Sequence, residues 1–189
     1  MKKNNLPVFP LGLVALPGTI QNLQIFEPRY ISMVKDCMKN NHGFVIVFQK
    51  SGEGNDFEIS KKGSYVEIID FNNLPNGLLG ISVKSINKVA ISNLVQLQDG
   101  LNVAEVNPLI DPEVDDQALL AEFPEISNIL NQLVKHPRVA DMPIEVDFNS
   151  ADSVAYHLAG LIPIPWSHKQ SLLEACLLYT SDAADDVRG

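Results

Sequence analysis

The spacing of apolar residues changes between the two parts of this sequence, and that change constrains the fold more than any other feature. Before residue 107 apolar residues alternate or form short runs, which is typical of strands. After residue 116 they recur every third or fourth position, which is typical of helices. The segment between, Asn107 to Asp116, is acidic and contains two prolines, the composition of a linker. The sequence therefore predicts a β-rich part over residues 1–107, a linker over 108–116 and a helical part over 117–175.

A hairpin is predicted around Asn76-Gly77, because both residues tolerate the positive φ angles of a tight turn. Residues 63–74 and 78–85 flank the turn, and the apolar residues of the second segment alternate with small or polar ones, as in a strand with one buried face. Other predicted strands are residues 23–26, 44–48, 89–97 and 103–106, with a proline-containing first or edge strand within residues 6–16. Several short strands separated by turns favour a closed or nearly closed barrel.

One helix is predicted inside the β-rich part. Its apolar stripe consists of Tyr30, Met33, Val34, Cys37 and Met38. Pro28 suits the first helical position, where its missing N–H costs nothing, and residues 40–43 end the helix. We expect this helix to dock on the sheet and Cys37 to be a buried structural thiol, since two cysteines in the chain provide no disulfide framework.

The second part contains two further helical stripes and a third possible helix. The stripes are Ile126, Ile129, Leu130, Leu133 and Val134, and then Val154, His157, Leu158, Leu161 and Ile162. Ser150 and Asp152 are alternative N-caps for the second stripe. The spacing of Ser167 and Gln170 has the form of a capping box before Leu172. We interpret residues 176–189 as a translated adapter sequence that does not belong to the fold, so the natural C-terminus is unobserved.

Charge and motifs exclude several classes of function. The formal net charge is −9, or −7 without the three aspartates and one arginine of residues 176–189, and a phosphate-binding surface requires basic residues. No phosphate-binding loop or acyl-nucleophile motif occurs, and the four histidines lack ligand spacing, so we expect no enzyme, cofactor or metal site. There is neither an apolar run long enough for a membrane span nor a signal peptide, which indicates a cytosolic protein.

Several segments together resemble LON domains. They are Leu6–Leu11, Leu16–Gly18, Leu23–Tyr30, Asp70–Ile81, Leu158–Pro163 and Leu172–Glu174 with Lys169-Gln170. Phe-Glu-Pro-Arg-Tyr at residues 26–30 and Leu-Pro-Asn-Gly-Leu-Leu-Gly at residues 74–80 resemble the free-standing bacterial branch more than the N-terminal domain of the complete protease. The resemblance implies an α+β fold, in which a PUA-like β-barrel with one packed helix is followed by a small helical bundle.

Three functions follow from the resemblance. The first is a non-catalytic module that binds unfolded or partly unfolded protein segments without ATP, in a groove between barrel and bundle, with a protease or a chaperone as a further partner. The second is the N-terminal part of a complete ATP-dependent Lon protease, because the natural C-terminus is unobserved. The third is an RNA binder, by analogy with other PUA-like barrels; the acidic charge argues against it.

Six residues are candidates for a peptide-binding site: Ile25, Phe26, Glu27, Arg29, Tyr30 and Trp166. Glu27 and Arg29 flank the start of the predicted helix, where a carboxylate suits the helix dipole and a guanidinium does not. We therefore expect Arg29 to have a carboxylate partner, either within the chain or on a ligand. Ile25, Phe26 and Tyr30 either line a groove or belong to the core. Trp166, on a proline-flanked loop, is either an exposed aromatic anchor or part of the barrel–bundle junction.

Overall fold

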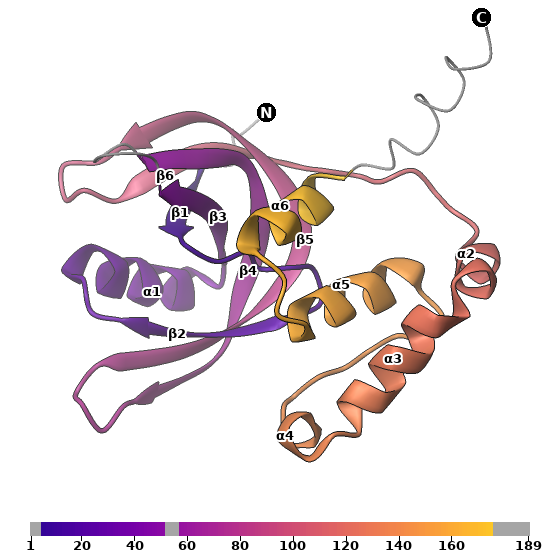
Figure 1. Ribbon diagram of the computed structural model, residues 1–189. Helices are drawn as coiled ribbons and strands as arrows, with labels where there is room; N and C mark the ends of the chain where they lie inside the picture. Colours follow the sequence, from indigo (N-terminus) through magenta and orange to yellow (C-terminus); the bar gives the residue numbers. More distant parts are fainter. Residues whose placement is uncertain (1–4, 52–56, 176–189) are drawn as a thin grey trace, which may run out of the picture.

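The computed structural model describes residues 5–51 and 57–175, which form one curved sheet, a helix packed on it and a group of helices beside it (Figure 1). This arrangement confirms the α+β class predicted from the sequence. The proposed adapter-derived segment, residues 176–189, lies outside the described residues. No helix in the described ranges is long and apolar enough to cross a membrane.

The sheet contains six strands in the order β2-β5-β4-β3-β1-β6. Their bounds are β1 Asn5–Leu11, β2 Ile20–Ile25, β3 Phe44–Ser51, β4 Phe57–Asn73, β5 Leu79–Gln96 and β6 Asn102–Pro108. All neighbours are antiparallel except β1 and β3, which are parallel. The C-terminal half of β5 also pairs with β6, so the pairings of five strands close into a circuit. Strand β2 extends the sheet outside this circuit. The sheet as a whole therefore differs from a simple barrel.

The longest strand, β5, joins two segments that the sequence predicts as separate strands. A register shift between Ser92 and Val95 bends its far end, where Asn93 has a φ of 51°. The hairpin turn before β5 is confirmed: Gly77 has a φ of 79°, and its N–H donates to the carbonyl of Leu74. A second turn is present before β2, with Gly18 at a φ of 81° and the N–H of Thr19 donating to the carbonyl of Leu16.

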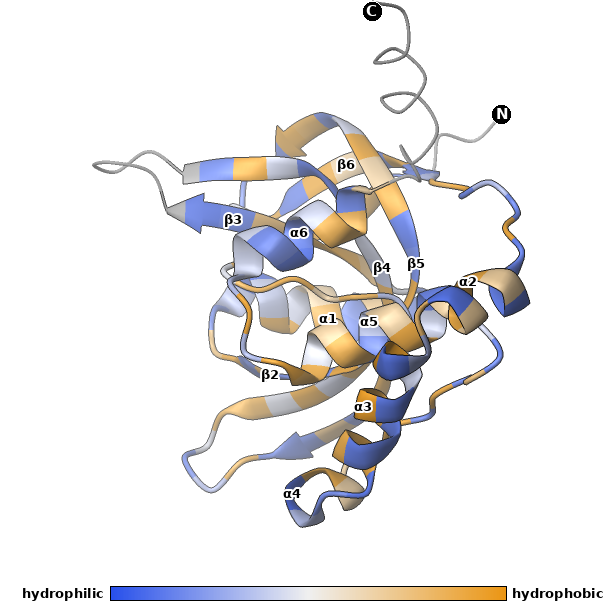
Figure 2. Ribbon diagram, turned by 45° about the vertical axis from the view of Figure 1, so that its right-hand side comes forward, coloured by the Kyte–Doolittle hydropathy of each residue, from blue (hydrophilic) through white to orange (hydrophobic). Residues whose placement is uncertain are grey.

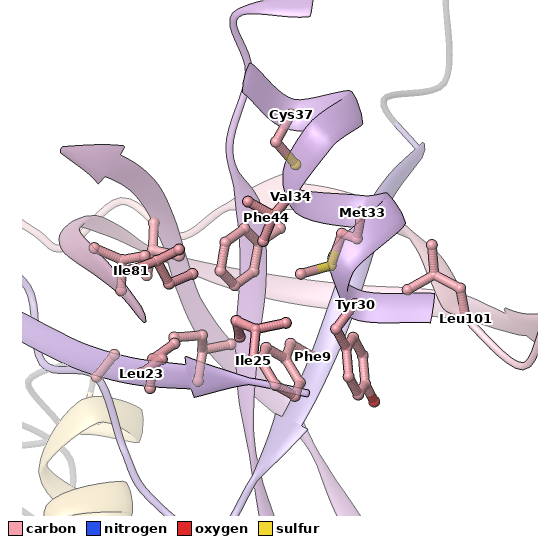
Figure 3. Packing of buried hydrophobic residues seen from close by; sticks show 14 residues of the cluster. Phe9, Leu23, Ile25, Tyr30, Met33, Val34, Cys37, Phe44, Ile81 and Leu101 are labelled. Atoms are coloured by element: carbon pink, nitrogen blue, oxygen red, sulfur yellow. The ribbon is translucent and has the colours of Figure 1, made fainter. Parts of the chain in front are cut away.

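Helix α1, Pro28–Asn40, buries Tyr30, Met33, Val34 and Cys37 against the sheet, and Figure 3 shows these side chains converging on Phe44 and Ile25. The fifth residue of the predicted stripe, Met38, is 44% exposed. Burying a large apolar side chain contributes about 1.5–3 kcal/mol, so four such residues hold the helix firmly.

Strand β3 is covered on both faces, as its continuous apolar run predicts. Phe44 and Ile46 belong to the cluster beneath α1. Val45 and Val47 point to the opposite face and pack with residues of β1, β5 and β6. Strand β3 therefore contributes side chains to both hydrophobic clusters, one on each face of the sheet.

The remaining helices are α2 Asp116–Glu122, α3 Pro124–Val134, α4 Pro137–Ala140, α5 Ala151–Leu161 and α6 Trp166–Glu174. Helix α3 contacts α5 and carries both hydrophobic and hydrophilic segments, as Figure 2 shows. Its predicted stripe is only partly covered, because Leu130 is fully buried whereas Ile129 is 47% exposed. Ser150 caps α5 by accepting a hydrogen bond from the N–H of Ser153. The capping box predicted at Ser167 is wrong, because the N-cap of α6 is Pro165, two residues earlier, and α6 has no side-chain cap.

Helices α5 and α6 attach the helical part to the sheet. A third cluster joins Val14 and Leu16, from the β1–β2 connection, to Tyr156, Ala159 and Leu173. Beside this cluster, the amide nitrogen of Gln170 on α6 donates to Ser60 Oγ at 2.8 Å and to the carbonyl of Lys62 at 3.1 Å, both on β4. The division at residues 107 and 116 stays a prediction; these contacts show that the two sides share buried surface.

Candidate functional site

A hollow of about 330 Å³ lies where β1, β2 and β3 end and α1 begins; we call it the α1 hollow. It is lined by Ile25, Phe26, Glu27, Arg29 and Tyr30 together with Phe9, Pro10, Leu11, Gln24 and Gln49. Five of the six candidate residues therefore meet in one place. The sixth, Trp166, lies elsewhere. The hollow sits at the edge of the sheet rather than in the expected groove between barrel and bundle.

The turn from β2 into α1 determines how the candidate side chains are presented. β2 ends at Ile25, whose side chain points into the core and is 1% exposed. Phe26 follows on the opposite side and is 65% exposed. Glu27 is the N-cap of α1, with extended backbone and no side-chain capping bond. The strand alternation thus buries Ile25 and leaves the ring of Phe26 at the rim of the hollow.

Arg29 has its compensating carboxylate within the chain. Its guanidinium pairs with Glu27, with Nη2 2.7 Å from Oε2, and Nη1 donates to the carbonyl of Gly100 at 2.7 Å. The guanidinium also lies 4.7 Å from the ring centroid of Tyr30. Through Arg29 these contacts connect the start of α1 to the β5–β6 turn. The guanidinium therefore has partners within the chain at both Glu27 and Gly100.

The floor of the hollow is aromatic. Tyr30 is 5% exposed and stacks on Phe9, with ring centroids 3.9 Å apart and planes 28° apart, as Figure 3 shows. Burial raises the pKa of the Tyr30 hydroxyl, although the nearby Arg29 acts in the opposite direction. The core interpretation of Ile25 and Tyr30 therefore holds, and the same two residues form the apolar base of the hollow.

The sequence predicts Trp166 on a loop. In the structure it is the first residue of α6. Its side chain is 42% exposed, and the ammonium of Lys169 lies 4.6 Å from its ring centroid. Lys169 in turn donates to the carbonyl of Gly160 at 3.3 Å. The indole therefore partly covers the contact between α6 and α5, away from the α1 hollow.

A second hollow, of about 280 Å³, lies between β5 and α5; we call it the junction hollow. Here Lys88, which is 5% exposed, pairs with Asp111 at 2.6 Å. Burial alone would lower the pKa of Lys88, but the hydrogen bond to Asp111 and the nearby Tyr156 raise it. Sequence reasoning missed this site, because the partners are separated by the whole of β6 and only a strand register brings them together.

In the part of the chain that the structure describes, no group of three or more His, Cys, Asp or Glu residues could hold a metal ion. Cys37 lies in the core, where burial raises the pKa of its thiol to about 11. His157 is 4% exposed, and its Nδ1 lies 2.7 Å from the carbonyl oxygen of Ser153. The α1 hollow, with an aromatic base and an exposed ring, has the chemistry of a binding surface.

Comparisons with solved structures define the class of fold. A Lon N-terminal domain protein from Xanthomonas campestris superposes with a TM-score of 0.71 at 25% identity, covering 92% of this chain and 91% of that one. The N-terminal domain of the Mycobacterium avium complex Lon protease superposes with a TM-score of 0.68 at 14% identity, covering 90% of each chain. The fold is that of Lon N-terminal domains.

The family follows from the sequence itself. Residues 5–178 match the model of the ATP-dependent protease La (LON) substrate-binding domain, and the chain belongs to that family. Curated relatives include Lon protease 1 of Bacillus subtilis, 24% identical over 97% of this chain, and a Lon protease of Halothermothrix orenii, 25% identical over 87%. The chain spans 24% and 22% of the length of these two relatives.

Proposed function

We propose that this chain is a non-catalytic module that binds unfolded or partly unfolded protein segments, and that it does so at the α1 hollow. The family is defined by substrate binding, and its protein substrates expose apolar side chains when they are unfolded. We also propose that it acts in the cytosol, where such segments could be passed to a protease or a chaperone.

The observation that carries the proposal is the exposure of Phe26. A phenylalanine that is 65% exposed leaves a large apolar area in water, and here it borders an aromatic floor made by Phe9 and Tyr30. Aromatic side chains beside a pocket contribute most of the binding free energy in many protein interfaces. Glu27 and Arg29 neutralise each other at the rim, so the hollow selects apolar character more than charge.

The experiment compares two phenylalanines. Phe26→Ala is expected to weaken binding of reduced, alkylated lysozyme, a permanently unfolded probe, by about tenfold in isothermal titration, because truncation of a hot-spot residue costs about 1–2 kcal/mol. Phe71 on β4 is 57% exposed and does not line the hollow, so Phe71→Ala is the matched control and should bind like the wild type. Titrations at about 0.15 M salt screen the attraction between the basic probe and this acidic chain. Absence of wild-type binding at high micromolar concentration would refute the proposal, and equal loss in both variants would refute the site.

A second candidate is that the chain is the N-terminal part of a complete ATP-dependent Lon protease. The observation in its favour is that the curated relatives are whole Lon proteases, of which the chain covers about a quarter. Sequencing the gene past the codon for Ala175 distinguishes the two. A nucleotide-binding loop and a Ser–Lys protease domain would establish the protease, whereas a stop within a few dozen codons would exclude it.

A further inference from the structure

Strand β2 has one free edge. It lies at the end of the strand order and pairs only with β5 among the described strands. In Figure 1 it runs along the margin of the sheet, between α1 and the β4–β5 hairpin. An edge strand presents unpaired N–H and C=O groups that can pair with another extended chain.

The hydrogen bonds at the start of the strand show which groups face the free side. The N–H of Ser85 donates to the carbonyl of Thr19 at 2.9 Å, and the carbonyl of Ser85 accepts from the N–H of Gly18 at 2.8 Å. Main-chain groups alternate in direction along an antiparallel pair, so the β5 residues two, four and six positions before Ser85 also face β2. Their partners in the register are Gln21, Leu23 and Ile25.

Asn22 and Gln24 consequently direct their N–H and C=O groups to the free side. Both residues are exposed, and no backbone partner for these groups occurs outside the sheet in the described ranges. Free edges in soluble proteins are usually shielded by lysine, proline or a bulge. The segment Ile20–Ile25 contains neither proline nor any charged residue, so this edge lacks those protections along its whole length.

The free edge leads directly into the α1 hollow. Gln24, whose main chain faces outward, lines the hollow together with Ile25 and Phe26. A hollow of about 330 Å³ is large enough to receive a large side chain. A strand laid along β2 would therefore place an apolar side chain over the floor formed by Phe9 and Tyr30.

We infer that the α1 hollow and the β2 edge form one site, in which an extended polypeptide segment adds to the sheet as a strand beside β2 and inserts an apolar side chain into the hollow. This inference rests on the proposed function and specifies the conformation of its substrate. The main-chain groups of Asn22 and Gln24 recognise any sequence in extended form, and the hollow selects apolar residues. The net charge of −9 disfavours a second copy of this chain as the occupant.

Residue-resolved amide exchange by NMR tests the strand pairing in the unmodified protein. The probe is an acetylated seven-residue peptide in which threonine alternates with phenylalanine or valine, with a terminal lysine for solubility. On saturation, exchange of the Asn22 and Gln24 amides should slow at least tenfold, whereas the Leu23 and Ile25 amides, already bonded to β5, should change little. Binding of the peptide without protection of Asn22 and Gln24 would overturn the inference. Protection that grows with protein concentration in the absence of peptide would also overturn it, by identifying a second copy as the occupant.

A pair of substitutions at one position separates the edge from the pocket. Gln24→Pro removes the outward N–H but no bond to β5, since proline is tolerated on an edge strand whose N–H faces outward. It should bind reduced, alkylated lysozyme about tenfold more weakly than Gln24→Ala, which loses the same side chain but keeps the N–H. If Phe26→Ala weakens binding while Gln24→Pro does not, the proposed function stands and the strand addition is wrong. If the wild-type chain binds neither probe, both are wrong.

Discussion

Two lysines that are each 5% exposed, Lys88 and Lys169, show how single residues adapt to burial in this fold. The ammonium of Lys88 pairs with the carboxylate of Asp111, which keeps it charged. The ammonium of Lys169 has a carbonyl and an indole ring as neighbours, and burial lowers its pKa. The difference matters for stability, because a buried charge is tolerated only with a partner.

The ion pair of Lys88 and Asp111 predicts that substituting one partner destabilises the protein more than substituting the other. Asp111→Ala leaves a buried ammonium without its carboxylate and should destabilise the protein by about 3–5 kcal/mol. Lys88→Met removes the buried charge and leaves Asp111 partly in contact with water, at 22% side-chain exposure, so it should cost clearly less. Urea unfolding of both variants measures the difference. Equal losses would mean that the pair acts through packing and not through charge.

Cys37 predicts a decline in stability at alkaline pH. Burial raises the pKa of its thiol from an ordinary 9.0 to about 11, so between these values the folded state keeps a proton that the unfolded state has lost. The unfolded state then binds fewer protons, and the free energy of unfolding falls as pH rises. At about 1.36 kcal/mol per pKa unit the loss across this window is about 2–3 kcal/mol. Urea titrations at several pH values measure the slope. Cys37→Ala should flatten it, and an unchanged slope in that variant would assign the effect to other groups.

At the scale of elements, the helices differ in how their ends are satisfied. Helix α5 has a side-chain cap from Ser150, whereas α6 starts after Pro165 without one. Helix α1 also lacks a capping side chain, but Arg29 in its first turn is held by Glu27 and by the carbonyl of Gly100. Of these three helices, only α5 therefore has a side-chain cap at its start.

Two serines test the assignment of the caps. Ser150→Ala removes the acceptor for the N–H of Ser153 and should cost about 0.5–2 kcal/mol. Ser167→Ala, at the position with capping-box spacing, should change stability by no more than about 0.5 kcal/mol, because that hydroxyl caps nothing. Thermal unfolding of the two variants gives the comparison. A large effect at Ser167 would show that α6 begins later than in this structure.

The sequence predicts an element well when its residue pattern is compatible with one local structure. The period of α1 and the turn at Asn76-Gly77 are examples, since local geometry alone determines both. The apolar stripe of α3 predicts that a helix forms. It does not predict which of its residues are buried, since Ile129 is 47% exposed. The predicted start of α6 is wrong because the cap signal of Ser167 and the proline at residue 165 lie within three residues of each other, and the proline sets the boundary.

Only some of the residues that line the α1 hollow can be predicted from the sequence. Candidates between Ile25 and Tyr30 are adjacent in the sequence, so their proximity needed no knowledge of the fold. Phe9 and Gln49 join them through the parallel pairing of β1 with β3, which no local pattern encodes. The free edge of β2 depends on the complete strand order, and so it emerged only from the structure.

For the whole molecule, the shared cluster of Val14, Leu16, Tyr156, Ala159 and Leu173 decides whether its parts are independent. Every one of these side chains is less than 10% exposed. They come from both sides of the proposed linker, so neither side completes this part of its core alone.

A fragment that ends at Asn107 is therefore expected to lack a stable fold. It would expose Val14 and Leu16 and lose Asp111, the partner of Lys88. At about 1.5–3 kcal/mol for each of these two side chains and about 3–5 kcal/mol for the unpaired Lys88, the loss is comparable to the total stability of an ordinary domain, about 5–15 kcal/mol. Thermal unfolding of residues 1–107 and 1–175, with binding of a hydrophobic dye, makes the comparison. A cooperative transition of the shorter chain near that of the longer one would establish an independent first subdomain.

The circuit of strands also has a consequence for the order of events during synthesis. Asn5 in β1 pairs with Glu105 in β6, so β1 waits for a hundred further residues to be synthesised before its second neighbour exists. Its other neighbour, β3, arrives much earlier, and Val8 can align with Val45 while β6 is still being made. Pairings between distant parts of a chain form slowly, because a long loop must close first. The nascent chain thus passes through a stage in which the sheet is open along β1. Strand β6 closes that gap, and the cluster shared with α5 and α6 forms only after those helices have been made.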